Sequence, residues 1–399
     1  MRRRLFILAL LVRLAAIVAT GPNTVHFGDG LDYIDAAHAL CDTHTYPARG
    51  SLPFFRAPGL AFFIAGVTLC HPSAVVVIKT GLAICDAITV VLIADLAFAP
   101  WIAGMIATLN PFFITAVCDV RSEPLFMLLL TLSIWCLLRG RAGGAGVTVA
   151  LAALTRPAAL LCIPLFALYR PRRAHLLLLG AALTLAPWTI RNAVRFHELI
   201  VVNDAGGFNF WRGYAPEIIA IDNMHDREAI AMASWQLDAR RVAEAATSIE
   251  RGAVTPRARS LAWSHTALDE IRSDPALAAR WTLRKAWLYW RPWLAPEQYS
   301  MAVVLASGAF NLLLYFGAGI ALVRCRDRRL VLGVLIYVAT VWLAHLPYQV
   351  VMRFRQPFTD PLMIALLAGA WKGAGLKVAP YRERADGDRE HRFAGPEHP

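Results

Sequence analysis

The chain has 399 residues, of which 57% are hydrophobic and 17% are charged, and its mean hydropathy is +0.49. A water-soluble protein could not remove that much apolar surface from solvent, so the composition excludes a soluble globular class. The formal net charge of +12 would suit nucleic acid, but 18 of the 40 Lys and Arg lie in five short clusters, with no basic stripe that carries interleaved aromatics. We therefore expect an all-α integral membrane protein that binds no nucleic acid.

The first apolar run follows a basic start and covers residues 5–20. It resembles a signal peptide but has a poor cleavage site, so we interpret it as an uncleaved first helix. The acidic loop 21–56 follows, on the outer side of the membrane. The next three apolar stretches, 57–72, 74–98 and 100–118, must together make an even number of crossings, so we expect one of them to be re-entrant or split.

The stretch 123–138 then returns to a basic cluster. Two short apolar runs, 145–155 and 158–169, meet at a hinge that contains Arg156. At about 1.5 Å per residue each is too short to cross a bilayer of ordinary thickness, so we expect a pair of half-length or re-entrant helices. The run 176–188 leads outward again.

The segment 191–300 differs from the rest because it carries 14 Lys or Arg against 13 Asp or Glu and has no run long enough to cross a membrane. Helical spacing of its apolar residues, and the turn Ser273-Asp274-Pro275, predict a small helical cap. Three final helices are expected at 301–323, 329–346 and 356–371. Including short or re-entrant ones, we expect about 10 to 12 membrane helices.

The sequence thus predicts four units. They are an N-terminal transmembrane catalytic module (1–190) with the outer acidic loop 21–56, an outer soluble helical segment (191–300), C-terminal transmembrane helices (301–371), and a disordered cytoplasmic tail (372–399).

The basic clusters predict the orientation of these units. Short Lys- and Arg-rich loops are typical of the cytoplasmic side, so both chain ends are expected there. The clusters are Arg2 to Arg4, Arg139 and Arg141, Arg170 to Arg173, Arg324 to Arg329, and the tail from Lys372.

The seven cysteines predict no disulfide framework, because most lie inside apolar runs and only Cys41 is clearly in an outer loop. Cys70 is among those assigned to an apolar run. The histidines show no metal-ligand spacing.

Polar side chains from separate segments gather at the outer ends of the predicted helices. An ionisable group near hydrocarbon costs about 2.5 to 3.5 kcal/mol, so such residues usually have a partner or a task. Arginines can offer forked donors to a phosphate, and a carboxylate can deprotonate an acceptor. The set comprises Asp29, Asp32, Arg56, Asp119, Arg121, Glu123, Arg156, Arg191, Asn192, Tyr348, Arg353 and Arg355.

Several short motifs occur in a fixed order along the chain. They are Asp29 with Tyr33, Tyr46, Phe55-Arg56-Ala57-Pro58-Gly59, Arg121-Ser122-Glu123-Pro124, Leu154-Thr155-Arg156-Pro157, Pro187-Trp188-Thr189-Ile190-Arg191-Asn192, Gly206-Gly207-Phe208-Asn209 with Gly213, and Arg353-Phe354-Arg355-Gln356-Pro357. In this order the chain resembles bacterial polyprenyl-phosphate-dependent glycosyltransferases of the GT-C superfamily. It looks close to glycosyltransferase family 39, which holds protein mannosyltransferases and lipid A aminoarabinose transferases.

The resemblance implies a GT-C-type bundle in the bacterial inner membrane. It also implies transfer of a sugar from a polyprenyl-phosphate donor to a lipid, glycan or protein acceptor, at the periplasmic or extracellular face. The first-loop acid is the catalytic base in such enzymes, which here falls on Asp29, and we place Glu123 beside it as a catalytic residue. A single inverting displacement is expected. The expected substrate-binding residues are Asp32, Tyr33, Arg56, Arg156, Arg191, Tyr348 and Arg353.

The sequence departs from the family pattern at two positions. Gly30 stands where many relatives carry a second acid, so any pair of acids would need Asp32, Asp119 or Glu123. Phe354 replaces a common Tyr. A divalent cation on Asp29 with Asp119 or Glu123 is left open, since hard cations take oxygen ligands.

Structural interpretations compete with these roles. Asp29 could be a helix N-cap, and Asp32 and Asp35 could simply face water. Arg353 and Arg355 would lie on the same side of an extended stretch, and Arg13 within the first helix is interpreted as a paired structural residue and not as a ligand. A transporter or flippase for a lipid-linked sugar is the alternative function, although it would place polar residues nearer the bilayer midplane. A ligase or polymerase acting on lipid-linked polysaccharide is a third.

Overall fold

The computed structural model describes residues 1–26, 28–222, 227–297, 299–369 and 376, and within them every regular element is helical. The helices before the cap are α1 (Arg2–Thr20), α2 (Gly28–Thr43), α3 (Gly59–Val67), α4 (Val75–Leu96), α5 (Pro100–Thr108), α6 (Pro111–Val117), α7 (Glu123–Leu138), α8 (Ala142–Thr155), α9 (Cys162–Tyr169) and α10 (Ala174–Phe196), with 3-10 turns at Pro157–Leu161 and Pro171–Arg173. The predicted tail 372–399 lies outside the described residues except for Leu376.

Eight further helices follow among the described residues. The helices of the cap are α11 (Gly206–Arg212), α12 (Pro216–Asp222), α13 (Arg227–Glu244), α14 (Pro256–Ser273) and α15 (Pro275–Trp290), with a π-helical turn at Ala245–Ile249, and those that follow it are α16 (Met301–Arg324), α17 (Arg328–His345) and α18 (Met352–Leu367). As the sequence predicts, a helix, α15, starts at this turn, and Asp274 caps it by accepting a hydrogen bond from the Leu277 amide at 2.8 Å. The division of the chain into four units stays a prediction.

Four helices in the described part of the chain are long and apolar enough to cross a membrane. They are α4, the stretch Pro171–Phe196 that contains α10, α16 and α17, and the bent pair α5 and α6 would make a fifth. Large apolar side chains also face outward from these helices, for example Leu183, Leu305 and Phe316. The chain is therefore a helical membrane protein, as expected, while the total of 10 to 12 membrane helices stays a prediction.

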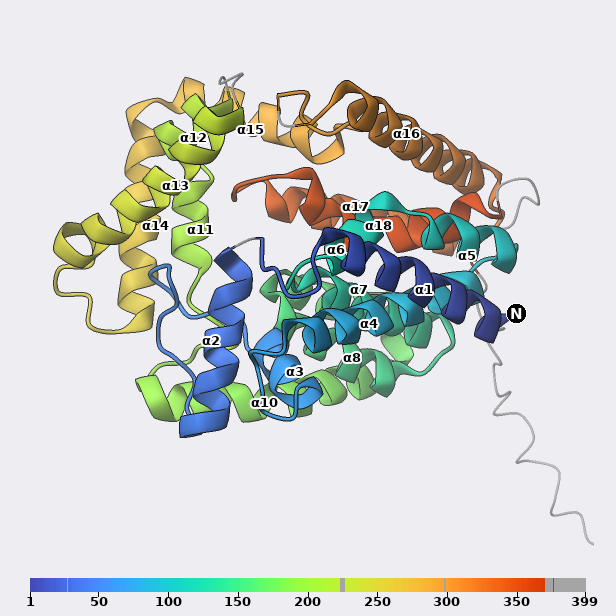
Figure 1. Cartoon of the computed structure of the whole chain (residues 1–399), viewed down its shortest axis with the longest axis horizontal. Helices are drawn as coiled ribbons and strands as arrows, with labels where there is room; N and C mark the ends of the chain where they lie inside the picture. The colour runs from blue at the N-terminus through green and yellow to red at the C-terminus, as the bar shows by residue number, and fades with distance from the viewer. Residues whose placement is uncertain (27, 223–226, 298, 370–375, 377–399) are drawn as a thin grey trace, which may run out of the picture.

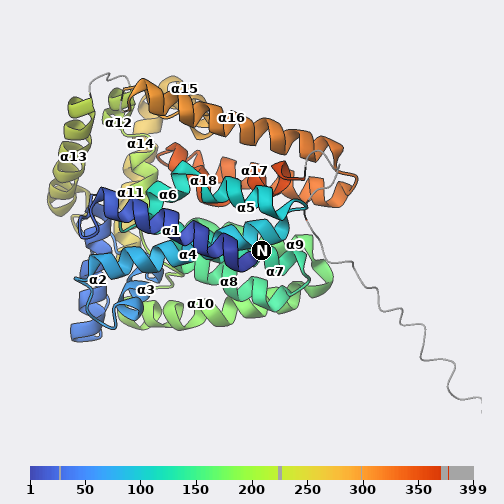
Figure 2. The same cartoon turned by 45° about the vertical axis from the view of Figure 1, so that its right-hand side comes forward.

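The long helices lie side by side, and the cap gathers at the end of the bundle away from the N-terminus (Figures 1 and 2). At the opposite end, residues from the four predicted basic clusters that the structure describes come together. Arg139 pairs with Asp95 at 3.0 Å, Arg2 pairs with the same carboxylate, and Arg173 donates to the carbonyl of Gly140 at 2.5 Å. We call these the cap end and the basic end.

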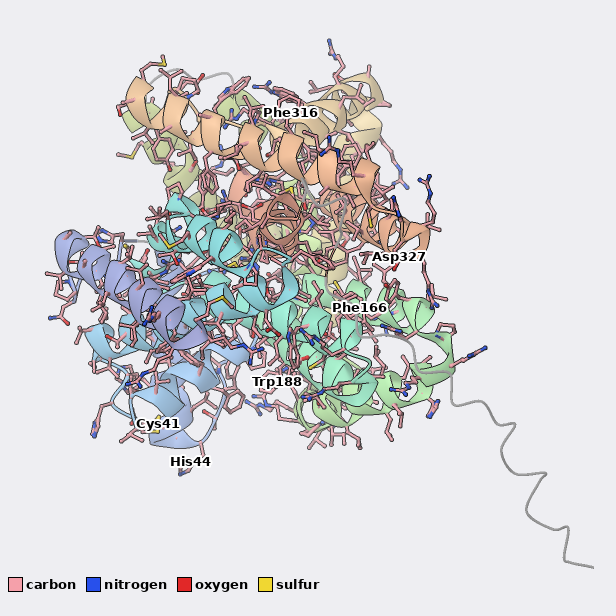
Figure 3. All side chains as sticks on the ribbon, turned by 90° about the vertical axis from the view of Figure 1, so that its right-hand side faces the viewer. Cys41, His44, Phe166, Trp188, Phe316 and Asp327 are labelled. Carbon is pink, nitrogen blue, oxygen red and sulfur yellow. A yellow bond between two sulfur atoms is a disulfide. The ribbon has the colours of Figure 1, made fainter. Side chains whose placement is uncertain are left out.

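A disulfide between Cys41 and Cys70, which lie 5.5 Å apart at Cα, contradicts the expectation from the cysteines (Figure 3 labels Cys41). Cys70 was assigned to an apolar run, but α3 ends at Val67 and the chain then turns back, with positive φ angles at Leu69 and Cys70. Cys70 therefore reaches the end of α2.

The disulfide also bears on the expected crossings between 57 and 118. The nine residues of α3 extend only about 14 Å, and the disulfide places the chain just before α4 beside the end of α2. α3 is thus too short to cross, and in this region α4 and the bent pair α5 and α6 are the segments long and apolar enough to do so. The sequence predicted one irregular stretch, and the structure has two, because α5 and α6 meet at a 53° bend.

Arg13 holds this bend together. Its Nε lies 2.6 Å from Asp86 of α4, and its other nitrogens donate to the carbonyls of Thr108 and Ala107 at 2.5 and 3.0 Å. Those carbonyls lie at the end of α5, where Pro111 interrupts the ladder of amide donors. Arg13 and Asp86 are both fully buried, so the predicted pairing of Arg13 is confirmed.

Removing one partner of this pair should strongly destabilise the protein, because the other charge would stay buried without a counter-ion. Asp86→Leu should lower the free energy of unfolding by about 3 to 5 kcal/mol, measured by thermal unfolding in detergent. The double variant Arg13→Leu/Asp86→Leu should recover only part of that loss, because the carbonyls of Ala107 and Thr108 then lose the donors that Arg13 supplies. Full recovery would mean that the carbonyl contacts contribute nothing.

The disulfide predicts a simple labelling result. The five other cysteines are free, so protein denatured without reductant should take up five alkylating groups, and protein denatured after reduction should take up seven. Mass spectrometry of the Cys41 and Cys70 peptides identifies the added sites. Cys41→Ser should lower the free energy of unfolding by about 2 to 4 kcal/mol. Seven labels without reductant would contradict the pairing.

Candidate functional site

The predicted acidic loop 21–56 contains a helix, because its four aspartates lie in the 16 residues of α2. Asp29 lies in the first turn of α2, where a carboxylate is favoured by the helix dipole. Asp32 and Tyr33 follow one turn later and are buried, whereas half of the Asp29 side chain is exposed (50%). Phe27 lies outside the described residues.

Arg56 joins the two carboxylates. It reaches Asp29 at 2.7 Å and Asp32 at 2.9 Å, and its guanidinium lies 5.8 Å from the ring centre of Tyr33. Burial by itself would lower the pKa of Arg56, but Asp29, Tyr33 and Asp32 raise it above its ordinary value. Arg56 is therefore a permanent cation in the site.

Asp32 does not face water, which corrects the structural interpretation of this residue. Its exposed fraction is 8%, and it accepts hydrogen bonds from the amide and the hydroxyl of Ser51, both at 2.9 Å, in addition to the pair with Arg56. Asp35, one turn further on, is exposed. Asp32 thus has the contacts of a carboxylate that fixes the loop 49–56, by which we mean residues 49 to 56 between α2 and α3.

Glu123, Arg156 and Arg353 lie on the other side of Asp29. Arg156, in the turn after α8, lies 3.1 Å from Glu123 at the start of α7. Arg353, in the first turn of α18, lies 3.9 Å from Asp29 and 4.0 Å from Glu123, so it connects the two carboxylates. Phe354 lies beneath the guanidinium of Arg156, at 5.3 Å.

Seven predicted site residues therefore form one network at the cap end of the bundle. We call it the carboxylate–arginine cluster, and it consists of Asp29, Asp32, Tyr33, Arg56, Glu123, Arg156 and Arg353.

Two predicted residues have other surroundings. Arg191 donates to the carbonyl of Tyr46 at 3.0 Å and lies over the ring of Trp188. Tyr46 lies between Arg191 and the cluster, because its hydroxyl donates to the carbonyl of Arg56. Tyr348 is 39% exposed, and its backbone lies against Gly213 of the cap. Their proposed roles toward substrate stay predictions.

Arg355 corrects another expectation. Because α18 begins at Met352, Arg353 and Arg355 belong to a helix, in which residues two apart point in different directions. Arg355 is fully buried and bonds to Asp360 at 2.8 Å and Asn311 at 3.1 Å. Only Arg353 reaches the cluster.

Gly30 has no room for a side chain. A Cβ built there would lie 2.9 Å from the carbonyl oxygen of Val120 and 3.0 Å from a methyl group of Val25. Asp119, next to Val120, is engaged with the amides of His26 and Val120. The first turn of α2 therefore presents Asp29 alone.

Two residues of the cap also face this site. Arg212 of α11 pairs with Asp238 of α13 at 3.2 Å. Burial raises the pKa of Asp238, Arg212 opposes that rise, and Asp29 and Arg56 also act on the carboxyl, so it lies within electrostatic reach of the cluster. The sequence analysis did not identify this pair, nor Ser51, nor Asp204, which accepts a hydrogen bond from the Phe55 amide beside Arg56. Contacts between distant segments leave no local pattern in the sequence.

The described residues contain no group of three or more His, Cys, Asp or Glu side chains that could hold a metal ion. In the cluster, the oxygens of Asp29 and Glu123 lie beside arginines. A divalent cation on Asp29 with Asp119 or Glu123 therefore stays an untested prediction.

The cluster combines a half-exposed carboxylate with three guanidiniums at the end of a membrane bundle. Such a carboxylate can accept a proton from an incoming group, and the guanidiniums can neutralise a phosphate. Glu123, whose side chain is 12% exposed, lies 3.1 Å from Arg156 and 4.0 Å from Arg353.

No family model matches the sequence, and no curated protein matches it either. Among solved structures, the chain is similar to the archaeal oligosaccharyltransferase AglB from Archaeoglobus fulgidus, determined in complex with an inhibitory peptide and a dolichol-phosphate. The sequence identity is 14%, the match covers 92% of this chain and 50% of that chain, and the TM-score is 0.49. The chain thus spans about half the length of that protein, and at this level of likeness no family assignment follows.

Proposed function

We propose that the protein is a membrane glycosyltransferase of the GT-C kind, which transfers a sugar from a polyprenyl-phosphate carrier to an acceptor. The observation that carries the proposal is the setting of Asp29, a half-exposed carboxylate within reach of Arg56 and Arg353 at the cap end of a membrane bundle. The order of motifs around these residues, which resembles glycosyltransferase family 39, supports the same reaction. The acceptor is a lipid, a glycan or a protein.

In the proposed reaction, a hydroxyl or amine of the acceptor attacks the anomeric carbon of the sugar. The bond from that carbon to the phosphate oxygen breaks, its electron pair stays on the phosphate, and the acceptor proton passes to Asp29. Because attack and departure occur on opposite faces, the configuration inverts. The leaving group is already an anion, so the site needs cations more than it needs a strong general acid.

The residues divide this work as follows. Asp29 is the base, and Arg56, Arg156 and Arg353 receive the phosphate. Asp32 and Glu123 hold these arginines in place, and Glu123 also completes the catalytic pair of acids. Tyr33, Arg191 and Tyr348 are proposed to contact substrate around this centre.

We place the site at the outer face of the inner membrane, with both chain ends in the cytoplasm. Two observations support this orientation. The basic clusters that the structure describes meet at the end away from the cap, and short basic loops are typical of the cytoplasmic side of a membrane protein. The Cys41–Cys70 disulfide lies beside α2 and α3, and disulfides persist in oxidising compartments.

Replacing Asp29 tests the base directly. Asp29→Asn should lower kcat for sugar transfer by about 10²- to 10⁴-fold, because the amide cannot take the acceptor proton. The assay uses purified protein with short-chain polyprenyl-phosphate sugars. Asp35→Asn, an exposed change on the same helix, is the matched control and should keep the wild-type rate.

Transfer by Asp29→Asn at nearly the wild-type rate would remove Asp29 from the role of base. If wild-type protein consumes no donor but moves lipid-linked sugar across vesicles, the protein is a flippase and the enzyme proposal fails.

The two arginines at the start of α18 provide a second test. Arg353 is 39% exposed and its ion pairs are long, so Arg353→Ala should leave the unfolding temperature nearly unchanged while transfer falls by about 10²-fold. Arg355→Ala should instead lower the free energy of unfolding by about 3 to 5 kcal/mol, because Asp360 would remain buried without its partner. Equal effects of both changes on stability would contradict this division.

A further inference from the structure

The loop 49–56 is held from two directions. On one side, Asp32 of α2 binds Ser51 and Arg56. On the other side, the segment that leads into the cap contacts the loop through Asp204. Since this loop carries Arg56, both sides bear on the position of that guanidinium.

Asp204 contacts the residue next to Arg56. Its Oδ1 accepts a hydrogen bond from the amide of Phe55 at 3.0 Å, and its Oδ2 pairs with Arg259 of α14 at 3.3 Å. Asp204 is 7% exposed and Phe55 is fully buried, stacked on Phe196 with ring centres 5.4 Å apart. One carboxylate therefore connects a helix of the cap to the backbone just before the arginine.

A second contact ties the same loop to the cap. Arg49, at the start of the loop, pairs with Glu250, which lies between α13 and α14. The loop is thus bound near both of its ends, at Arg49 by Glu250 and at Phe55 by Asp204, which itself pairs with α14 of the cap. A cap that moved away would release the backbone on which Arg56 depends.

We infer that Asp204 is a positioning residue that makes the placement of Arg56 depend on a docked cap. It does not touch substrate. Its effect passes through the Phe55 amide to the guanidinium that bridges Asp29 and Asp32. The inference rests on the proposed function for its effect on transfer, whereas its effect on the loop does not.

The charges around Asp204 come from two elements. Arg259 faces it from α14, and Arg49 of the loop lies within electrostatic reach, with Glu250 as its own partner. Burial raises the pKa of Asp204 to about 6, while the Phe55 amide and Arg259 oppose that rise. The contact with Arg259 therefore weakens when the pH falls below about 6, as the carboxyl takes up a proton.

The exchange rate of the Phe55 amide hydrogen reports how firmly Asp204 holds the loop, and its measurement needs no substrate. Asp204→Ala should speed exchange of the Phe55 amide by about tenfold, because the amide loses its acceptor. Asp204→Asn keeps an oxygen for that amide and should change exchange less, which guards against a variant that fails to fold. Glu198→Gln is the matched control, since Glu198 also accepts from a backbone amide, that of Arg257, and from the Thr255 hydroxyl, but ties only the cap linker to α14.

Transfer kinetics then measure the consequence for the site. Asp204→Ala should lower kcat by about 10- to 100-fold, as a displaced catalytic group would. In an Arg56→Lys background the same change should cost little more, because the group through which Asp204 acts is already altered. Glu198→Gln should keep the wild-type rate in both backgrounds.

The pH dependence of the transfer rate distinguishes this role from a general loss of stability. The ratio of the wild-type rate to that of Asp204→Asn should fall toward one as the pH drops below about 6, because the protonated wild-type carboxyl then resembles the amide. Above that pH the ratio should be constant.

Each outcome bears on one claim. Unchanged exchange at Phe55 in Asp204→Ala, or losses that multiply with Arg56→Lys, would overturn the positioning role. If wild-type protein transfers no sugar, the proposed function fails, and the exchange measurement alone then decides whether Asp204 fixes the loop.

Discussion

The sharing of one guanidinium between two carboxylates is the interaction on which the site depends. Arg56 bridges Asp29 and Asp32, which lie one turn apart on α2. Charges at the edge of a bilayer are costly unless they are paired. This ion-pair bridge therefore stabilises two carboxylates at the end of the membrane helices. Asp32 is buried and bound by Ser51 and Arg56, whereas the side chain of Asp29 is half exposed. Of the two carboxylates, Asp29 is therefore the one that an incoming group can reach.

The bridge also organises the segments around it. α2 supplies the acids, the loop 49–56 supplies the cation, and the cap holds that loop through Asp204. On the far side, Arg353 links Asp29 to Glu123 and so connects α18 with α7. Segments from the beginning, middle and end of the chain thus meet at one point, which explains why no short piece of the sequence contains the site.

Much of this arrangement follows from sequence patterns, because they report on the membrane. Apolar runs predict α4, α16 and α17, and the basic clusters within the described residues meet at one end, as their positions between those runs indicate. Polar residues at helix ends predict most of the cluster for the same reason, since a charge there must have a partner. Arg191 and Tyr348 are also polar residues at helix ends, but Arg191 contacts Tyr46 and Tyr348 lies against the cap. A position at a helix end does not specify the direction in which the side chain points.

Other features could not be predicted, for identifiable physical reasons. The helix α2 mixes glycine, acids and small residues, so its periodicity is weak, and Cys70 looks like part of an apolar run until the end of α3 is known. The final helix is expected to begin at residue 356, beside Pro357, yet α18 already begins at Met352 and carries Pro357 as an exception inside the helix, where the hydroxyls of Tyr337 and Thr359 donate to carbonyls. The position of Arg355 depends on that exception. Asp204 meets Phe55 only through the packing of the cap.

The close contact at Gly30 limits how this site could change. Most crowded positions accept a larger residue when a flexible side chain moves aside, but here the nearest obstacle is the carbonyl oxygen of Val120. A second acid directly after Asp29 would therefore require the turn before α7 to be rebuilt at the same time. An engineer who wished to give this chain two adjacent acids, or a lineage that acquired them, would need coordinated changes in two distant segments, and single substitutions would not lead there.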